Sequence, residues 1–145
     1  MANNYFRKST NSKPKETTLF GIQLPIQLTQ ASGSNLWTWE YGGQQMRNHF
    51  ASGFWYSQDG KNVFWGWQEL KDHTITSIKK VDILMDATSG RQYVEVKRKD
   101  KPTWKQYLDE AVCICFHGRP ENPNQHVNHK DGNICNCNAD NLEWK

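Results

Sequence analysis

The sequence has no long hydrophobic run, and this absence excludes several classes of protein. No stretch approaches the ~18 consecutive apolar residues that a membrane-spanning helix needs, and hydrophobic residues make up only 36% of the 145. The first eighteen residues, MANNYFRKSTNSKPKETT, lack the apolar centre of a secretion signal. We therefore expect a cytoplasmic protein without a membrane partner.

Cysteine and net charge are also low. The four cysteines are expected to be reduced, because nothing in the sequence directs export to an oxidising compartment. Cys113-x-Cys115 and Cys135-x-Cys137 are one residue too short for the usual zinc knuckle, and on a helix the first two would point about 200° apart. Zinc is therefore the less favoured alternative to buried thiols. The net charge of +3 is only a weak indication of a polyanionic partner.

Aromatic residues are abundant, with seven Trp, five Tyr and six Phe. Most lie between residues 19 and 96, where apolar and polar side chains alternate as in half-buried strands. In NLWTWEY this period places Trp37, Trp39 and Tyr41 on one face. Turn and edge-strand signals are Asp59-Gly60, Ser89-Gly90 and Pro25. We predict an antiparallel meander of about five or six strands, whose aromatics form a core; a platform for stacking bases is the alternative.

Basic residues gather in one stretch of the chain and at the N-terminus. The stretch contains Arg91, Lys97, Arg98, Lys99, Lys101 and Lys105. In a strand Lys97 and Lys99 share a face, so a stripe that faces DNA phosphates is one interpretation. A solvated edge hairpin protected by lysines is the other. Residues 1–18 are also basic, and we expect a flexible arm there, with or without a role in contacting DNA.

The segment from Thr103 to Phe116 is expected to be a helix. Thr103 suits the N-cap position. Apolar residues recur at helical spacing at Tyr107, Leu108, Ala111, Val112 and Cys115. Gly118 and Pro120 follow in the order expected after a helix end.

The closing stretch, from HVNHKDGN to NLEWK, carries residues suited to phosphodiester chemistry. A short strand from His126 to His129 would lead through a Lys-Asp-Gly-Asn turn to a second extended piece, Asn141 to Trp144. Hydrolysis of a phosphodiester needs a base that titrates near neutral pH and a hard cation that stabilises charge on the phosphate. His129 suits the first role. Oxygen atoms suited to the second lie on Asn128, Asp131 and Asp140.

The run F-H-G-x-P, V-N-H-K-D-G-N and D-N-L-E-W, between residues 111 and 144, resembles the HNH, or ββα-metal, endonuclease family. The similarity is to its phage and intron-borne branch, and it rests on His-x-Asp-Gly-Asn followed by Asn-Leu twelve residues after the His. With the strand pattern, the resemblance predicts an α+β fold. A strand-rich region at residues 19–100 would be a DNA-binding module, and an HNH-like core of a helix and a hairpin would occupy residues 101–145.

The resemblance also implies roles for individual residues. His129 would be the general base that activates water, and Asn141 would brace the loop and orient that base. Asn128 and Asp131 would bind Mg²⁺ or a similar divalent cation. Lys130 and the six basic residues between Arg91 and Lys105 would contact double-stranded DNA.

Three departures from the family pattern point away from activity. The family's hairpin is followed by a helix that completes the metal site, whereas this sequence stops at Lys145, so the core would lack that helix unless an assembly partner supplied it. Asn128 is neutral where many relatives carry Asp, and Mg²⁺ prefers anionic oxygen. Asp109-Glu110 stand where relatives usually carry His-Arg, and two negative charges there would repel DNA.

We therefore predict a homing endonuclease-like HNH nuclease that hydrolyses DNA with a metal ion and His129. The alternative is a catalytically decayed HNH fold that serves as a DNA-binding protein or as a structural protein, for example in a phage particle. If the protein is phage-encoded, its expected location is the host cytoplasm or the virion.

Overall fold

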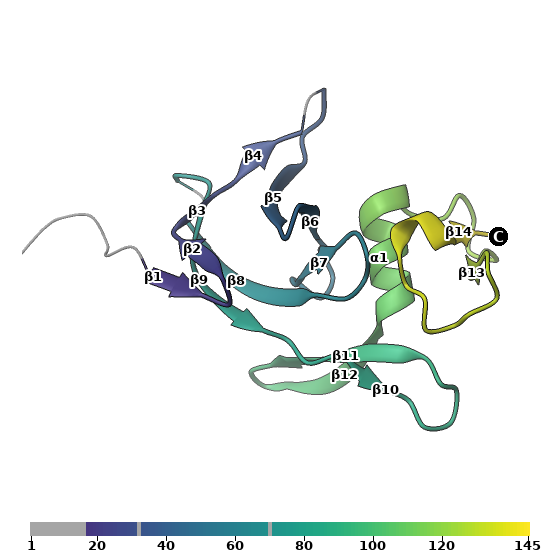
Figure 1. Ribbon diagram of the computed structural model, residues 1–145. Coiled ribbons are helices and arrows are strands. Elements are labelled where there is room, and N and C mark those ends of the chain that lie inside the picture. Colours follow the sequence, from purple (N-terminus) through teal and green to yellow (C-terminus); the bar gives the residue numbers. More distant parts are fainter. Residues whose placement is uncertain (1–16, 32, 70) are drawn as a thin grey trace, which may run out of the picture.

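Strands make up most of the structure. The computed structural model describes residues 17–31, 33–69 and 71–145. The strands are β1 (Thr17–Leu19), β2 (Ile22–Leu24), β3 (Ile26–Gln27), β4 (Thr29–Gln30), β5 (Trp37–Tyr41), β6 (Gln44–Asn48), β7 (Trp55–Ser57), β8 (Val63–Glu69), β9 (Thr74–Lys80), β10 (Leu84–Met85), β11 (Gln92–Arg98), β12 (Lys101–Tyr107), β13 (Val127–His129) and β14 (Leu142–Trp144). Only α1 (Leu108–His117) and the 3-10 helix η1 (Ala139–Asn141) are helical in this part of the chain (Figure 1). The fold is therefore mostly β, and the predicted α+β class is wrong.

Seven of the strands form one antiparallel sheet that nearly closes on itself. Their order is β3-β9-β8-β7-β6-β5-β4. The two edge strands, β3 and β4, are separated in the chain by Leu28 alone, so the two edges of the sheet converge there (Figure 1). Inside the curled sheet lie the buried residues Ile22, Leu24, Ile26, Leu28, Trp39, Met46, Trp55, Phe64, Ile75 and Ile78. The predicted alternation, the edge position after Pro25 and the core role of these aromatics are confirmed.

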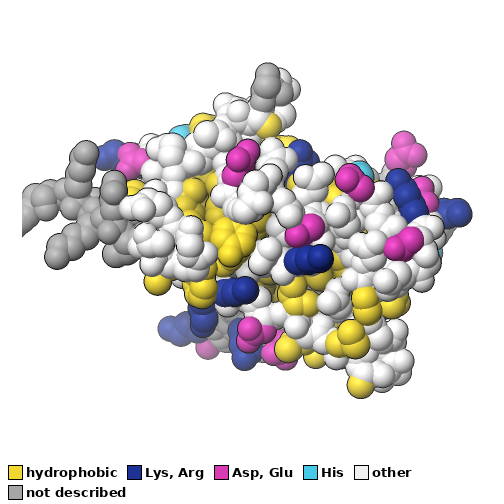
Figure 2. Space-filling model, viewed as in Figure 1, with side chains coloured by type: hydrophobic (Ala, Val, Ile, Leu, Met, Phe, Trp, Pro, Cys, Tyr) yellow, Lys and Arg dark blue, Asp and Glu magenta, His cyan; other side chains and the backbone are white. Residues whose placement is uncertain are grey.

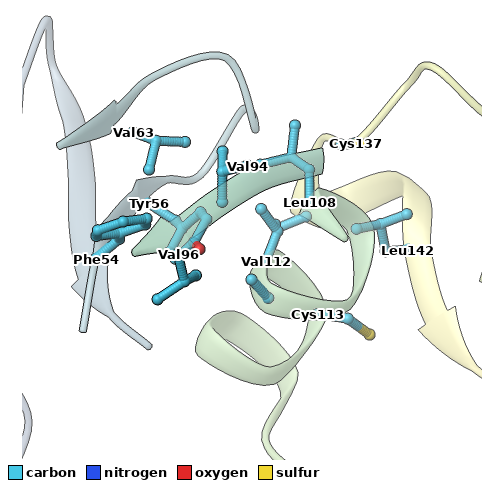
Figure 3. Packing of buried hydrophobic residues seen from close by; sticks show 12 residues of the cluster. Phe54, Tyr56, Val63, Val94, Val96, Leu108, Val112, Cys113, Cys137 and Leu142 are labelled. Carbon is cyan, nitrogen blue, oxygen red and sulfur yellow. The ribbon is translucent and has the colours of Figure 1, made fainter. Parts of the chain in front are cut away.

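A second core joins this barrel-like sheet to the rest of the chain. It lies among the three-stranded sheet β10-β11-β12, helix α1, the end of the barrel and the hairpin β13–β14. Figure 3 shows its side chains converging from these elements, including Tyr56 of β7, Val94 of β11, Val112 of α1 and Leu142 of β14. Helix α1 is therefore packed on both sides, and the hairpin is held against it.

Helix α1 begins at Leu108, not near Thr103 as the sequence indicated. Residues 101–107 form β12 instead, because they pair with β11, with Trp104 opposite Val96 and Tyr107 opposite Tyr93. Pairing with a neighbouring strand outweighs the local helical pattern. The helix ends as expected, with Gly118 following it at φ +80°. The boundary expected between the DNA-binding module (residues 19–100) and the HNH-like core (residues 101–145) falls at the turn of the β11–β12 hairpin.

The N-terminal arm expected at residues 1–18 lies outside the described residues, except that Thr17 and Thr18 belong to β1. Among the helices of the described ranges, none combines the length and apolar character needed to cross a membrane.

Candidate functional site

The hairpin β13–β14 presents His129 beside helix α1. His129 lies opposite Leu142, and Asn128 lies opposite Glu143. Two contacts tie the hairpin segment to the end of the helix: Trp144 Nε1 donates to Gly118 O at 2.7 Å, and His117 Nε2 lies 2.6 Å from Ala139 O. The short strands predicted at both ends of the closing segment are thus present and anchored.

The imidazole of His129 faces the carboxylate of Asp109. Its Nε2 lies 3.5 Å from Asp109 Oδ2, and the two side chains are only 11% and 4% exposed. Nε2 itself is buried and has no hydrogen bond of ordinary length to a described residue. One of the two nitrogens that could take a proton is therefore closed off from solvent and lies next to a negative charge.

Asp109 also binds Arg91, so three ionisable side chains from separate parts of the chain meet at this point. Arg91 Nη2 donates to Asp109 Oδ1 at 2.8 Å and lies 3.4 Å from Glu110 Oε2, while its guanidinium lies 3.7 Å from the centre of the Tyr107 ring. Burial alone would lower the pKa of Arg91, but the hydrogen bond and charge of Asp109 and the charge of Glu110 outweigh it and raise that pKa. The Arg91–Asp109–His129 cluster thus links the region before β11, helix α1 and the hairpin.

The two predicted metal ligands both take part in hydrogen bonds of the hairpin segment, Asn128 through its amide nitrogen and Asp131 through its carboxylate oxygens. Asn128 Nδ2 donates to Glu143 Oε2 at 2.7 Å. Asp131 Oδ2 accepts from Asn136 Nδ2 at 2.8 Å, and Oδ1 accepts from Asn133 N at 2.8 Å. These hydrogen bonds, from Asn136 first and Asn133 next, lower the pKa of Asp131.

The predicted ligands offer a Mg²⁺ ion one carboxylate, Asp131, and one neutral amide, Asn128. Mg²⁺ needs carboxylate oxygens in a near-octahedral shell. Across residues 17–31, 33–69 and 71–145, no three His, Cys, Asp or Glu side chains gather in a group that could hold a metal ion. Binding of a divalent cation stays a prediction.

Asn141 braces the loop between the two strands of the hairpin. Its Oδ1 accepts from Asp131 N, and its Nδ2 donates to Asp131 Oδ1 and Asn136 O, each at 3.0 Å. This is the loop-bracing contact expected for Asn141. Its side-chain hydrogen bonds within the described chain go to the loop, and none goes to His129.

The seven predicted DNA-contacting residues divide into two groups. Three have partners within the protein: Arg91 as above, Lys105 in an ion pair of 3.2 Å with Asp86, and Arg98 over the Trp104 ring at 5.0 Å. The other four are exposed and form no ion pair within the described ranges: Lys97, Lys99, Lys101 and Lys130. Lys130 follows β13 on the far side of α1 from the β11–β12 turn (Figure 1), so it does not join the other three.

Three residues that the sequence analysis did not single out line a cleft beside Lys97. Trp65 of β8 and Lys79 and Lys80 of β9 face this cleft of about 560 Å³. The Lys-Lys pair was visible in the sequence, but only the pairing of β8 with β9 brings it next to Trp65. The cleft lies apart from the His129 cluster.

The four cysteines differ in exposure and in acidity. Cys113 and Cys115 lie on α1, as expected. Burial, with the charges of Asp109 and Glu143, raises the pKa of Cys113 to about 11; burial raises the pKa of Cys115 to about 12. Burial and the charge of Asp109 raise the pKa of Cys137 to about 12. Cys135 is exposed.

We expect an aromatic disulfide reagent at neutral pH to titrate one thiol rapidly and three slowly. The thiolate is the reacting form, and raised pKa values keep it scarce at Cys113, Cys115 and Cys137. Cys135→Ser should remove the fast phase, and urea should bring all remaining thiols into it. A fast phase that survives in Cys135→Ser would contradict this assignment.

Comparison with known proteins places this fold beside a nuclease. No family model matches the sequence, and no curated protein matches it either. Among solved structures the chain is similar to one described as "DNA binding and cleavage by the HNH homing endonuclease I-HmuI", with a TM-score of 0.50 and 21% identity over 69% of this chain. The match covers 51% of that chain, so this protein spans about half the length of the endonuclease.

The similarity is one of fold. Residues 101–145 are less than a third of the 145-residue chain, so a match over 69% of it must include strands from the N-terminal region. The protein therefore has a fold similar to that of an HNH homing endonuclease, beyond the hairpin that carries the sequence motif.

Proposed function

We propose that this protein binds double-stranded DNA through the β11–β12 turn and does not use His129 to cleave it. The observation that carries the proposal is the position of His129, whose Nε2 is buried and faces Asp109 at 3.5 Å. This proposed function corresponds to the alternative derived from the sequence, a decayed HNH fold that retains DNA binding.

Hydrolysis would require His129 to reach a water molecule beside a phosphate. A general base must lie within hydrogen-bond reach of the proton that it takes, and Nε2 is closed to solvent, so this nitrogen is not placed to take a proton from water. Cleavage through Nε2 would need His129 to leave Asp109. A cation at Asp131 would compete with the hydrogen bonds from Asn133 and Asn136.

DNA binding is supported by the exposed lysines of the β11–β12 turn. Lys97, Lys99 and Lys101 surround the turn, where Asp100 is the one acidic residue, and none of the three forms an ion pair within the described chain. Figure 2 shows Lys and Arg side chains gathered at the end of the molecule where β11 and β12 turn. Such a protruding group of cations can contact the phosphates of a duplex without reading its sequence.

Removal of two turn lysines should weaken duplex binding and reduce its dependence on salt. In Lys99→Ala/Lys101→Ala, the slope of log K against log salt should fall by about 1.8, since each phosphate contact contributes about 0.9. Fluorescence anisotropy of a short labelled duplex measures this slope. The matched control is Lys61→Ala/Lys71→Ala, which removes the same charge from exposed lysines of two other turns. An equal fall in the control would overturn the proposed interface.

The cleavage part of the proposal is tested with supercoiled plasmid in Mg²⁺ and in Mn²⁺. Wild type and His129→Ala should give the same background amount of nicked circle. Nicking by the wild type that His129→Ala abolishes would refute the proposal and support the endonuclease predicted from the sequence.

A further inference from the structure

A cleft between the barrel and the small sheet combines an aromatic ring with several cations. It encloses about 560 Å³ between β8–β9 and β10–β11. Trp65, Lys79 and Lys80 line it from the barrel, and Leu84 and Lys97 from the small sheet. Its size falls in the range of about 300–1,000 Å³ that is usual for small-ligand pockets.

Trp65 presents its ring to solvent beside a lysine. The residue is 39% exposed, although large aromatic side chains usually bury. In the antiparallel pairing of β8 and β9, Trp65 lies directly opposite Lys79. Directly paired residues share one face of a sheet, so the side chains of Trp65 and Lys79 leave the barrel from the same face, and both line the cleft.

The charged lining of the cleft is weakly positive. Lys79, Lys80 and Lys97 contribute three positive charges, and Asp82 and Glu95 contribute two negative ones, which leaves 3 − 2 = +1. No ion pair within the described ranges involves any of the three lysines. This balance favours a ligand of modest negative charge that also has a flat, apolar face.

We propose that this cleft binds an unpaired nucleotide of single-stranded DNA, with the base stacked on Trp65 and the adjoining phosphates held by Lys79, Lys80 and Lys97. Aromatic rings beside a positive groove are the means by which proteins hold single strands without sequence preference. A duplex cannot use this site, because its bases are already stacked on one another. The site shares Lys97 with the duplex interface of the β11–β12 turn but does not include Lys99 or Lys101, and it adds a second form of DNA to the proposed function.

The test measures binding of labelled oligothymidine by fluorescence anisotropy. Trp65→Ala should weaken binding about 5- to 150-fold, the range for losing one base-stacking contact, and Trp65→Phe should recover part of the loss. Trp67→Ala is the matched control. Trp67 is 56% exposed on the same strand and does not line the cleft, but its ring centre lies 6.3 Å from that of Trp65, so its removal should weaken binding much less than Trp65→Ala does. Equal losses in Trp65→Ala and Trp67→Ala would overturn the assignment to the cleft.

A further ligand separates stacking from simple charge attraction. An abasic strand of the same length should bind more weakly than oligothymidine. Binding of the abasic strand that is as tight as that of oligothymidine overturns the proposal. In Lys79→Ala/Lys80→Ala, the salt slope for oligothymidine should fall by about 1.4, at about 0.7 for each phosphate contact on a single strand.

The two proposals fail independently. Lys99→Ala/Lys101→Ala should lose affinity for the duplex and keep oligothymidine binding, whereas Trp65→Ala should do the reverse. A wild type that binds duplex but not oligothymidine overturns only the cleft proposal. A wild type that binds oligothymidine but not duplex overturns only the duplex interface.

Discussion

Gly60→Ala should lower the free energy of unfolding by about 2–5 kcal/mol. About 1–2 kcal/mol of this is the cost of a side chain on a residue with left-handed backbone angles. The other part, about 1–3 kcal/mol, is the cost of forcing a methyl group into a packed site. Gly60 lies in the β7–β8 turn at φ +70°. A Cβ atom there would be 2.3 Å from the carbonyl oxygen of Cys137 and 2.8 Å from its carbonyl carbon. The obstacle is backbone and not the end of a flexible side chain, so a rotamer change cannot relieve it.

The turn that carries Gly60 has little freedom to move away. Asp59 accepts from Ser57 Oγ at 2.6 Å and from Gln44 Nε2 at 2.8 Å. A backbone hydrogen bond also joins the turn to the C-terminal loop: Ala139 N donates to Gln58 O at 2.8 Å. A methyl group at Gly60 must therefore push the loop of Cys137 and Ala139 out of the second core.

Gly132→Ala separates the two parts of this effect. Gly132 has nearly the same backbone angle, φ +76°, but its Cβ would meet nothing within 4 Å. Its substitution should cost only the backbone part, about 1–2 kcal/mol. Urea midpoints of the two variants measure the difference. A Gly60→Ala protein that is as stable as Gly132→Ala would show that the approach of Cys137 is not a constraint.

The strands of the barrel could be predicted because their signals are local. Alternation of apolar and polar residues with period two determines which side chains face the interior, whatever the partner strand is. Trp39 and Ile26 are buried as this rule requires. The turn predicted at Asp59-Gly60 is also present, between β7 and β8, and Gly60 has a positive φ there.

The start of α1 and the fold class could not be predicted, since they depend on pairing between distant segments. Residues 103–107 carry a helical pattern, but Trp104 and Tyr107 pair with β11, so the chain stays extended until Leu108. The same pairing converts much of the expected helix into strand. Together with the many short strands of the barrel, it makes the fold mostly β.

In the candidate site too, features that depend on neighbouring residues could be predicted, whereas contacts between distant segments could not. The hairpin and the bracing of Asp131 by Asn141 follow from residues close together in the sequence. The contact of His129 with Asp109 crosses twenty positions of the chain, and no pattern within either segment indicates it. In the sequence, Asp109-Glu110 departs from the family pattern, but the contact of Asp109 with His129 is visible only in the fold.

Asp109→Ala should destabilise the protein by about 3 kcal/mol, the lower end of the range for breaking a buried ion pair. The carboxylate is 4% exposed and is the partner of both Arg91 and His129. Its removal leaves the guanidinium of Arg91 with Glu110 as its one remaining described counter-charge, and it takes from the buried Nε2 of His129 its neighbouring carboxylate. The loss is at the lower end because Arg91 is 27% exposed and Glu110 remains 3.4 Å away.

Two comparison variants identify the origin of the effect, with stability measured by urea unfolding. Glu110→Ala removes a 46% exposed carboxylate from the same cation and should cost at most about 1 kcal/mol. Arg91→Met/Asp109→Leu replaces the Arg91–Asp109 pair by apolar groups and should recover much of the loss, because the main penalty is an unpaired buried charge. If Asp109→Ala costs no more than Glu110→Ala, the cluster does not hold the hairpin to α1, and His129 is free to turn toward solvent.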